Sequence, residues 1–179
     1  MRFEFKAVRE MSASESSAHD ALRAIVYPPD PGATPPIVQY DWVPPEWRAL
    51  AWDDTGALVS TTGALVRRVL VDGRPTTIGG VGSVKTHPAV EGKGYASAGL
   101  RQAMAFLNGE MQVAFSLLVC REPLVPFYGR RGWTVFPGTV LAERKDGRTE
   151  PFTLNVVMLS AGTTARPAGG LIDLCGPPW

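Results

Sequence analysis

Apolar and charged residues alternate at the start of the chain. Phe3 and Phe5 stand between charged neighbours, a pattern typical of a half-buried β-strand. Ser12 precedes Glu15 by three residues, which is the spacing of a helix capping box, and apolar positions continue at helical spacing to about Ile25. The beginning of the chain therefore predicts a strand followed by a helix.

The same kinds of pattern predict the remaining elements. Strands are expected over 47–52, 57–71, 75–86, 113–120, 133–140 and 152–159, and helices over 94–108 and 124–130. A bulge is expected near Gly63, and Asp72-Gly73 is a strong hairpin signal. The last two strands should pair antiparallel across a charged turn. This order indicates an α/β (α+β) fold in which helices flank a mixed, mostly antiparallel sheet.

Residues 27–45 differ from the rest of the chain because prolines recur through them. They exclude a regular helix or an interior strand. Since Tyr40 and Trp42 are aromatic, we expect a packed segment that faces a ligand rather than a free linker. Asp41 lies between the two rings, and a solvated turn aspartate and a ligand contact are both open for it.

Composition narrows the class of protein. The chain has 179 residues, 45% hydrophobic and 20% charged, which predicts a single compact domain. We place this domain over 1–160, and we expect the tail over 161–179 to be docked because its end, 171–179, is apolar and aromatic. A net charge of +1 gives no indication of nucleic acid or a membrane surface as partner. No apolar run has the length of a membrane span and the first residues lack a signal-peptide pattern, so a cytoplasmic location is expected.

The chain is poor in metal-binding residues. Cys120 and Cys175 are too few for a disulfide framework, and only His19 and His87 are available as imidazole ligands. Cys120 lies in an apolar run and is expected to be buried. No metal site is predicted.

The clearest candidate for chemistry is the segment 84–100, where a strand ends and a helix begins. Gly92 and Gly94 can adopt positive φ and place no side chain between a ligand and the backbone. The N–H groups of the first helical turn should point back into this turn and attract a phosphate or pyrophosphate. Neither the Rossmann fingerprint nor the P-loop fits, because Gly94 is followed by Tyr95. A turn that only links strand to helix is the alternative.

Two segments resemble motifs of the GNAT superfamily of N-acetyltransferases. Residues 91–96, EGKGYA, resemble motif A (Gln/Arg-x-x-Gly-x-Gly/Ala) at every position but the first. Residues 127–133, FYGRRGW, resemble motif B and follow in the expected order, with a strand between the two motifs. The resemblance implies the GNAT fold for most of the chain.

The resemblance also implies an acetyl-CoA site. The turn that would hold the pyrophosphate consists of Glu91, Gly92, Lys93, Gly94, Tyr95, Ala96 and Ser97. Main-chain groups of Val84 and Thr86 would pair with the pantetheine arm. Tyr128 would act as general acid toward the departing thiolate, because a phenol stays protonated at neutral pH. The general base is open, since the strand 78–84 contains no acid; His87 is one candidate, and a surface role is its alternative.

A closer resemblance is to the aminoglycoside 2′-N-acetyltransferases. It rests on Asp41-Trp42, the hairpin 65–73, the segment 128–133 and a final tryptophan. By analogy the α-carboxylate of Trp179 would take part in catalysis, and Tyr40, Asp41 and Trp42 would line the acceptor pocket, with the tail docked near it.

Two departures from those enzymes bear on the acceptor. Their strand glutamate aligns with Gly82, and an acidic residue near their C-terminus aligns with Pro177. Because a polycationic sugar needs several carboxylates, a less cationic and more aromatic acceptor is predicted.

The predicted function is transfer of an acetyl group from acetyl-CoA to a primary amine by direct attack. Transfer of a longer acyl chain is a variant of it. The alternatives are a non-catalytic acyl-CoA-binding protein, an aminoglycoside 2′-N-acetyltransferase, and a glycine-turn module for another phosphate ligand. The predicted partner is a small-molecule amine, with a homodimer left open.

Overall fold

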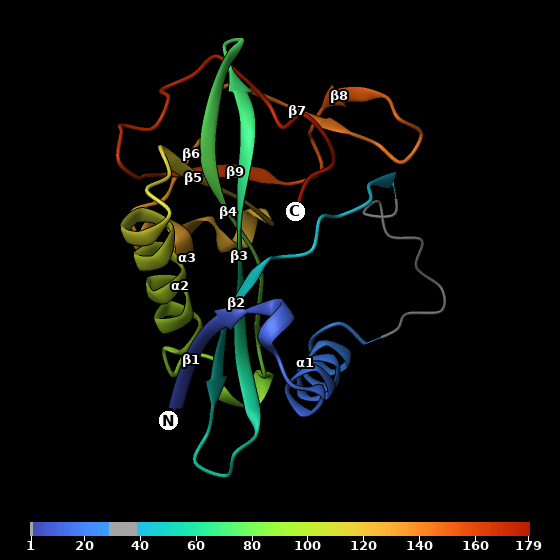
Figure 1. Ribbon diagram of the computed structural model, residues 1–179, viewed down its shortest axis with the longest axis vertical. Helices are drawn as coiled ribbons and strands as arrows, with labels where there is room; N and C mark the ends of the chain where they lie inside the picture. The colour runs from blue at the N-terminus through green and yellow to red at the C-terminus, as the bar shows by residue number, and fades with distance from the viewer. Residues whose placement is uncertain (1, 29–38) are drawn as a thin grey trace. The chain divides into compact units, whose positions relative to one another are not determined.

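The computed structural model describes residues 2–28 and 39–179 (Figure 1). The chain forms two compact units, the first of Met1–Ala33, Pro45–Leu65 and Val81–Phe106, the second of Thr34–Pro44, Val66–Gly80 and Leu107–Trp179. Two long strands, β3 (Leu58–Val71) and β4 (Arg74–Thr86), contribute residues to both units. Part of the predicted proline-rich segment, 29–38, lies outside the described residues.

The first unit holds a sheet with a helix on each face. Its elements are β1 (Arg2–Ala7), η1 (Val8–Glu10), α1 (Ala13–Val26), β2 (Trp47–Trp52), the start of β3, the end of β4, η3 (Pro88–Val90) and α2 (Tyr95–Ala105). Leu22 of α1 packs in one cluster with Leu50, whereas Tyr95 of α2 packs in another with Ala51. Because neighbouring residues of a strand point to opposite faces, α1 and α2 cover opposite faces of β2 (Figure 1).

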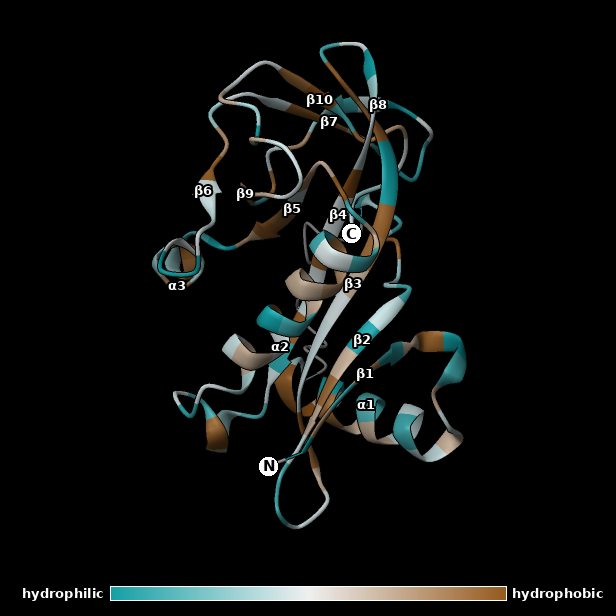
Figure 2. Ribbon diagram, turned by 60° about the vertical axis from the view of Figure 1, so that its left-hand side comes forward, coloured by the Kyte–Doolittle hydropathy of each residue, from teal (hydrophilic) through white to brown (hydrophobic). Residues whose placement is uncertain are grey.

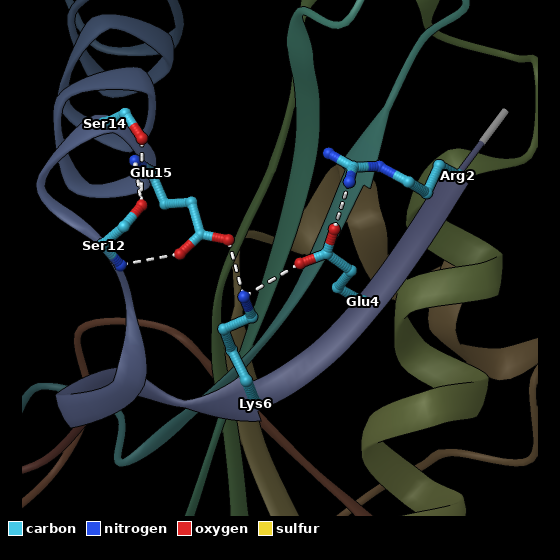
Figure 3. A network of polar contacts seen from close by, with 6 residues as sticks. All are labelled: Arg2, Glu4, Lys6, Ser12, Ser14 and Glu15. Carbon is cyan, nitrogen blue, oxygen red and sulfur yellow. Dashed lines mark hydrogen bonds and ion pairs between the residues drawn. The ribbon is translucent and has the colours of Figure 1, made fainter.

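The capping box predicted at the start of α1 is confirmed and ties the helix to β1 (Figure 3). The Glu15 N–H donates to Ser12 Oγ at 3.2 Å, and the Ser12 N–H donates to Glu15 Oε2 at 2.7 Å. Lys6 Nζ donates to Glu15 Oε1 at 2.6 Å and lies 2.9 Å from Glu4 Oε2. These contacts, the Lys6 ammonium first, lower the pKa of Glu15 to about 2.

The second unit holds the other strands. They are β5 (Phe115–Cys120), β6 (Thr134–Val135), β7 (Thr139–Glu143), β8 (Thr149–Pro151), β9 (Val156–Ala161) and β10 (Leu171–Asp173), together with η5 (Glu122–Leu124) and α3 (Val125–Gly129). A π-helical turn, η4 (Phe106–Glu110), follows α2. The strand order is β6-β9-β5-β4-β3-β10-β7-β8.

The predicted fold class is confirmed. Strand β10 runs parallel to β7, whereas the pairs β1–β2, β2–β3, β3–β10, β5–β9, β6–β9 and β7–β8 are antiparallel. Strand β5, brown in Figure 2, is buried on both faces, because the consecutive residues Leu117 and Leu118 are both buried. Cys120 is buried at its end, and burial raises the pKa of its thiol.

Two local predictions differ from the structure. The strand expected over 133–140 is divided into β6 and β7, because Pro137 cannot donate to a ladder and Gly138 passes too close to the Gly170 carbonyl for a side chain to fit. The expected bulge at Gly63 is absent from the pairing of β2 with β3, where Gly63 stays in register with Arg48 and the irregularity falls between Ala51 and Trp52.

The predicted hairpin turn is confirmed. Asp72 and Gly73 connect β3 to β4, and both have positive φ, 48° and 79°. Such a pair of left-handed residues is typical of the two-residue turns that join antiparallel strands.

Neither a membrane-spanning helix nor a metal cluster is found in the described part of the chain. None of its helices is long and apolar enough to cross a bilayer. Over the same residues, no group of three or more His, Cys, Asp or Glu side chains is placed to hold a metal ion.

Candidate functional site

The glycine turn before α2 is open to a ligand. Gly92 and Gly94 have φ of +77° and +86°, a conformation that L side chains rarely adopt. A Cβ added at either position would meet nothing within 4 Å, so the space beside both residues is open. Residues 91–94 are exposed. The backbone of this turn is therefore accessible, and glycine is required by conformation rather than by crowding from the protein itself.

The start of α2 completes an anion-binding arrangement. Gly94 is the N-cap and supplies no side-chain oxygen to the first N–H groups of the helix. Those groups carry the positive end of the helix dipole. The first-turn residues Ala96 and Ser97 are only half-buried. The arrangement is compatible with the phosphate or pyrophosphate that the sequence predicts, and that role stays a prediction.

Side chains around this turn differ in role. Glu91 and Lys93 are exposed, so both are available to a ligand or to solvent. The Tyr95 ring is buried, packs with Ala51 and Val59 and lies 6.3 Å from the Phe3 ring. Tyr95 therefore anchors the helix, and what it offers a cofactor is its backbone.

Strand β4 reaches the turn through an unusual backbone position. Ser83 has a φ of +53°, a left-handed conformation that costs a non-glycine residue about 1 kcal/mol. Beyond it, Thr86 Oγ1 lies 2.9 Å from Ser60 Oγ on β3, and the His87 N–H donates to the Val59 carbonyl at 2.8 Å. The predicted pantetheine contacts at Val84 and Thr86 thus lie on a strand held firmly by β3, and they stay a prediction.

His87 supports the local backbone. Its Nδ1 accepts a hydrogen bond from the Ala89 N–H at 3.1 Å and caps η3. The ring also lines a groove of about 420 Å³ within the first unit, together with residues of α1 and of the β2–β3 hairpin. Because Nδ1 is an acceptor, a neutral His87 carries its proton on Nε2. A capping role is thus established, and the general base stays open.

In the second unit, motif B forms an aromatic turn. Tyr128 is buried on α3, with ring centroids 5.0 Å from Phe127 and 6.5 Å from Trp133. Gly132 has a φ of +84°, which lets the chain reverse so that the Trp133 N–H donates to the Tyr128 carbonyl at 3.3 Å. The spacing of the motif therefore follows from a left-handed glycine between two packed rings.

The predicted acceptor residues lie at the start of the same unit. Tyr40 is buried, with its ring centroid 6.2 Å from Trp42 and 5.4 Å from Phe152. Burial raises the pKa of Tyr40, so this phenol is protonated at neutral pH. Asp41 is exposed and lies 3.4 Å from Lys145 Nζ. The two rings pack as the sequence predicted, and the acceptor role of all three residues stays a prediction.

The C-terminal tail is docked on the second unit. Trp179 is 7% exposed, and its indole N–H donates to the Leu117 carbonyl at 3.4 Å. Arg67 donates to the Pro177 carbonyl at 2.6 Å, and the Val43 N–H donates to the Pro178 carbonyl at 2.8 Å. The structure thus brings the tail together with the segment that carries Tyr40, Asp41 and Trp42.

Two buried charged side chains, Arg48 and Lys85 in the first unit, were missed by the sequence interpretation. Close to them, the Nε2 atom of the half-buried His19 is buried without a hydrogen-bond partner in the described structure. A signal was present, since Arg48 interrupts the apolar strand 47–52 and Lys85 stands between Val84 and Thr86. Charged residues inside strands of apolar or small residues are rarely neutral in function.

Comparisons with known proteins agree with this geometry. A search of curated protein sequences gives no match. The chain resembles ElaA from Escherichia coli, with 16% identity and a TM-score of 0.61 over 89% of this chain and 98% of that one. It also resembles a GNAT family acetyltransferase from Brucella melitensis in complex with acetyl-CoA, with 14% identity and a TM-score of 0.59 over 96% and 94% of the two chains.

A third structure and a family model complete the comparison. The GNAT family N-acetyltransferase YhbS from Escherichia coli, in complex with CoA, is 16% identical with a TM-score of 0.60 over 97% of this chain and 90% of that one. At these identities the likeness shows a shared fold. A family model described as acetyltransferase (GNAT) domain matches residues 7–136, which is more than half of the chain. The chain therefore belongs to the GNAT acetyltransferase family.

Proposed function

We propose that this protein transfers an acetyl group from acetyl-CoA to a primary amine that is less cationic than an aminoglycoside. The observation that carries the proposal is the turn at Gly92 and Gly94, where two left-handed glycines leave open space beside an uncapped helix start. Two similar structures of the same fold hold acetyl-CoA or CoA. Acetyl-CoA would supply the acetyl group as a thioester that an amine can attack.

The chain's own groups would hold the cosubstrate by its charged end. N–H groups of the turn and of the first residues of α2 would donate to the pyrophosphate. Exposed Lys93 would add a positive charge, which offsets the charge of Glu91. The backbone of β4 at Val84 and Thr86 would pair with the pantetheine amides. Such binding depends little on side chains, so substitution at the glycines should disturb it most.

Charges near the predicted acceptor residues support an acceptor that is less cationic than an aminoglycoside. By the resemblance to the aminoglycoside 2′-N-acetyltransferases, two positions that carry carboxylates in those enzymes correspond to Gly82 and Pro177 in this chain. Asp41 lies within ion-pair distance of Lys145, so its charge is already partly balanced. Because each buried ammonium of an aminoglycoside needs a charged partner, we infer an acceptor with fewer positive charges.

The experiment that tests this function is release of CoA thiol from acetyl-CoA in the presence of a panel of primary amines. We expect thiol release that depends on one class of amine, together with an acetylated product detected by mass. Double-reciprocal plots of initial rate against acetyl-CoA at several amine concentrations should give intersecting lines, because direct attack requires both substrates on the enzyme. Parallel lines would indicate a covalent enzyme intermediate. Tight CoA binding without thiol release for any amine would instead favour the non-catalytic alternative.

A further inference from the structure

Two buried cations lie under α1 in the first unit. Arg48 on β2 is 8% exposed and Lys85 on β4 is 5% exposed. Charged side chains this deeply buried are almost always paired with an opposite charge, because removing a charge from water is costly. The partners of these two side chains therefore bear on what the site binds.

Both cations point to the face that α1 covers. Arg48 is two residues from Leu50, which packs against α1, so the two side chains share a face of β2. On β3, Ser60 is paired with Ala51, which faces α2, and Ser60 Oγ contacts Thr86 Oγ1 at 2.9 Å. Thr86 therefore faces α2, and its neighbour Lys85 faces α1. Arg48 and Lys85 thus lie on one face, on strands that flank β3.

Neither cation has an anionic partner among the residues that the structure describes. Arg48 Nη1 is buried without a hydrogen bond, and over those residues no carboxylate lies within 4 Å of either side chain. Among the described residues, Lys85 Nζ donates to Ser83 alone, to its hydroxyl at 3.0 Å and its carbonyl at 3.4 Å. The cluster is therefore short of negative charge.

The neighbours of the cluster supply little of that charge. The charge of Asp20 on α1 acts on Arg48, but the Asp20 side chain is 76% exposed and its ion pair is with His19 Nδ1 at 3.2 Å. Burial, followed by the charges of Arg48 and Lys85, lowers the pKa of His19, so this ring is neutral at pH 7. The pKa of Lys85 is itself lowered to about 8 by burial and by Arg48 and Arg23. An anion bound beside Arg48 and Lys85 would offset the electrostatic repulsion between these two cations.

The cluster lies on the strand proposed to bind acetyl-CoA. Lys85 stands between Val84 and Thr86, whose main-chain groups are the proposed contacts of the pantetheine arm. A ligand held by Lys85 on the α1 face would therefore lie beside that arm. Burying unpaired charge costs stability. The presence of two buried cations beside the proposed cofactor strand therefore indicates a function in binding.

We propose that Arg48 and Lys85 bind a carboxylate of the acceptor, so that the substrate is an amine that also carries an acidic group, such as an amino acid. This inference rests on the proposed acetyltransferase function and names its substrate class. The guanidinium and the ammonium would donate charge-assisted hydrogen bonds to the carboxylate oxygens. The acceptor's own carboxylate would then complete the charge balance that the described residues leave open.

The test compares matched acceptors in the thiol-release assay. Each amino acid is measured beside its decarboxylated amine and beside the aminophosphonate of the same length. We expect the carboxylate to be preferred over the neutral amine by about 100-fold or more in kcat/KM, because a site built for a charged group rejects an analogue that lacks it. Preference for the aminophosphonate over both would identify a phosphate-type acceptor and overturn the carboxylate assignment.

Variants separate recognition from folding. Lys85→Met and Arg48→Gln should each reduce the ratio of kcat/KM for the carboxylated acceptor to kcat/KM for its neutral amine by about tenfold or more. Arg9→Gln, at a side chain 84% exposed on η1, should leave this ratio unchanged. The melting temperature of Lys85→Met should stay equal or rise, because an unpaired buried charge is removed. If both acceptors lose activity equally, or if the variant unfolds at lower temperature, the cations are structural and the inference is wrong.

Failure of the inference and failure of the proposed function give different results. If the protein binds no CoA and releases no thiol, the acetyltransferase proposal falls and this inference falls with it. If CoA binds and neutral amines are acetylated as fast as their carboxylated partners, only this inference is overturned. Direct titration of 5-aminopentanoate into the CoA complex provides a readout without turnover, with binding expected for the wild type and lost in Lys85→Met.

Discussion

Replacing Lys85 by methionine should stabilise the protein at neutral pH. Burial first, and then the charges of Arg48 and Arg23, lower the pKa of Lys85 from 10.5 to about 8. Each pH unit of that difference corresponds to about 1.4 kcal/mol, so a charged Lys85 costs the folded state about 3 kcal/mol at pH 7. Methionine removes this cost and also the hydrogen bonds to Ser83, each of about 1 kcal/mol. The expected gain in the free energy of unfolding is about 1 to 2 kcal/mol.

The gain should depend on pH in one direction. Between pH 8 and 10.5 an unfolded Lys85 binds more protons than a folded one, so the stability of the wild type rises with pH over this window. Below pH 8 the full cost is present. The difference between Lys85→Met and wild type should therefore be largest near pH 7 and should shrink toward pH 10.5.

Urea denaturation at pH 7 and at about pH 9.5 measures both effects. Arg9→Gln is the matched control, because it removes an exposed cation of the same unit and should leave the free energy of unfolding unchanged at both values. A loss of stability in Lys85→Met at pH 7 would refute the reasoning. So would a gain of equal size at both pH values, since only the titration of Lys85 makes the gain pH-dependent.

Three other predictions follow from single side chains. Tyr128→Phe should lower turnover about 100-fold with CoA affinity unchanged, and unchanged turnover would exclude the general-acid role. His19→Gln should lose less stability than the wild type between pH 6.5 and pH 5, because burial and two neighbouring cations lower the pKa of His19, so that the unfolded wild type binds a proton there more tightly than the folded protein does. An equal loss of unfolding free energy in the variant and the wild type over this range would contradict this. Ser12→Ala should cost about 1 kcal/mol in urea denaturation through loss of the capping box, whereas Ser16→Ala within the same helix should be nearly neutral.

Features set by neighbouring residues could be predicted from the sequence. The capping box of Ser12 and Glu15 depends on residues three apart, and the hairpin at Asp72 depends on the following glycine. The glycine turn is of the same kind, because the left-handed φ of Gly94 is a preference of that residue itself. The fold class followed from the order of such local signals.

Features that depend on distant segments could not be predicted. Arg48 and Lys85 are 37 positions apart in the printed sequence, and they become buried neighbours only because β2 and β4 both pair with β3 and α1 covers that face. The parallel pairing of β10 with β7 likewise joins segments with no local signal in common. The left-handed Ser83 is also invisible in the sequence, since serine has no preference for positive φ.

The central claim is that the glycine turn holds the pyrophosphate of CoA, and calorimetric titration of CoA into two alanine variants tests it most directly. Gly94 and Gly73 have φ of +86° and +79°, and a Cβ at either meets nothing within 4 Å, so Gly94→Ala and Gly73→Ala should lose similar stability. We predict that Gly94→Ala weakens CoA binding by about tenfold or more and that Gly73→Ala binds like the wild type. Equal affinity in the two variants, or no binding of CoA to the wild type, would contradict the account.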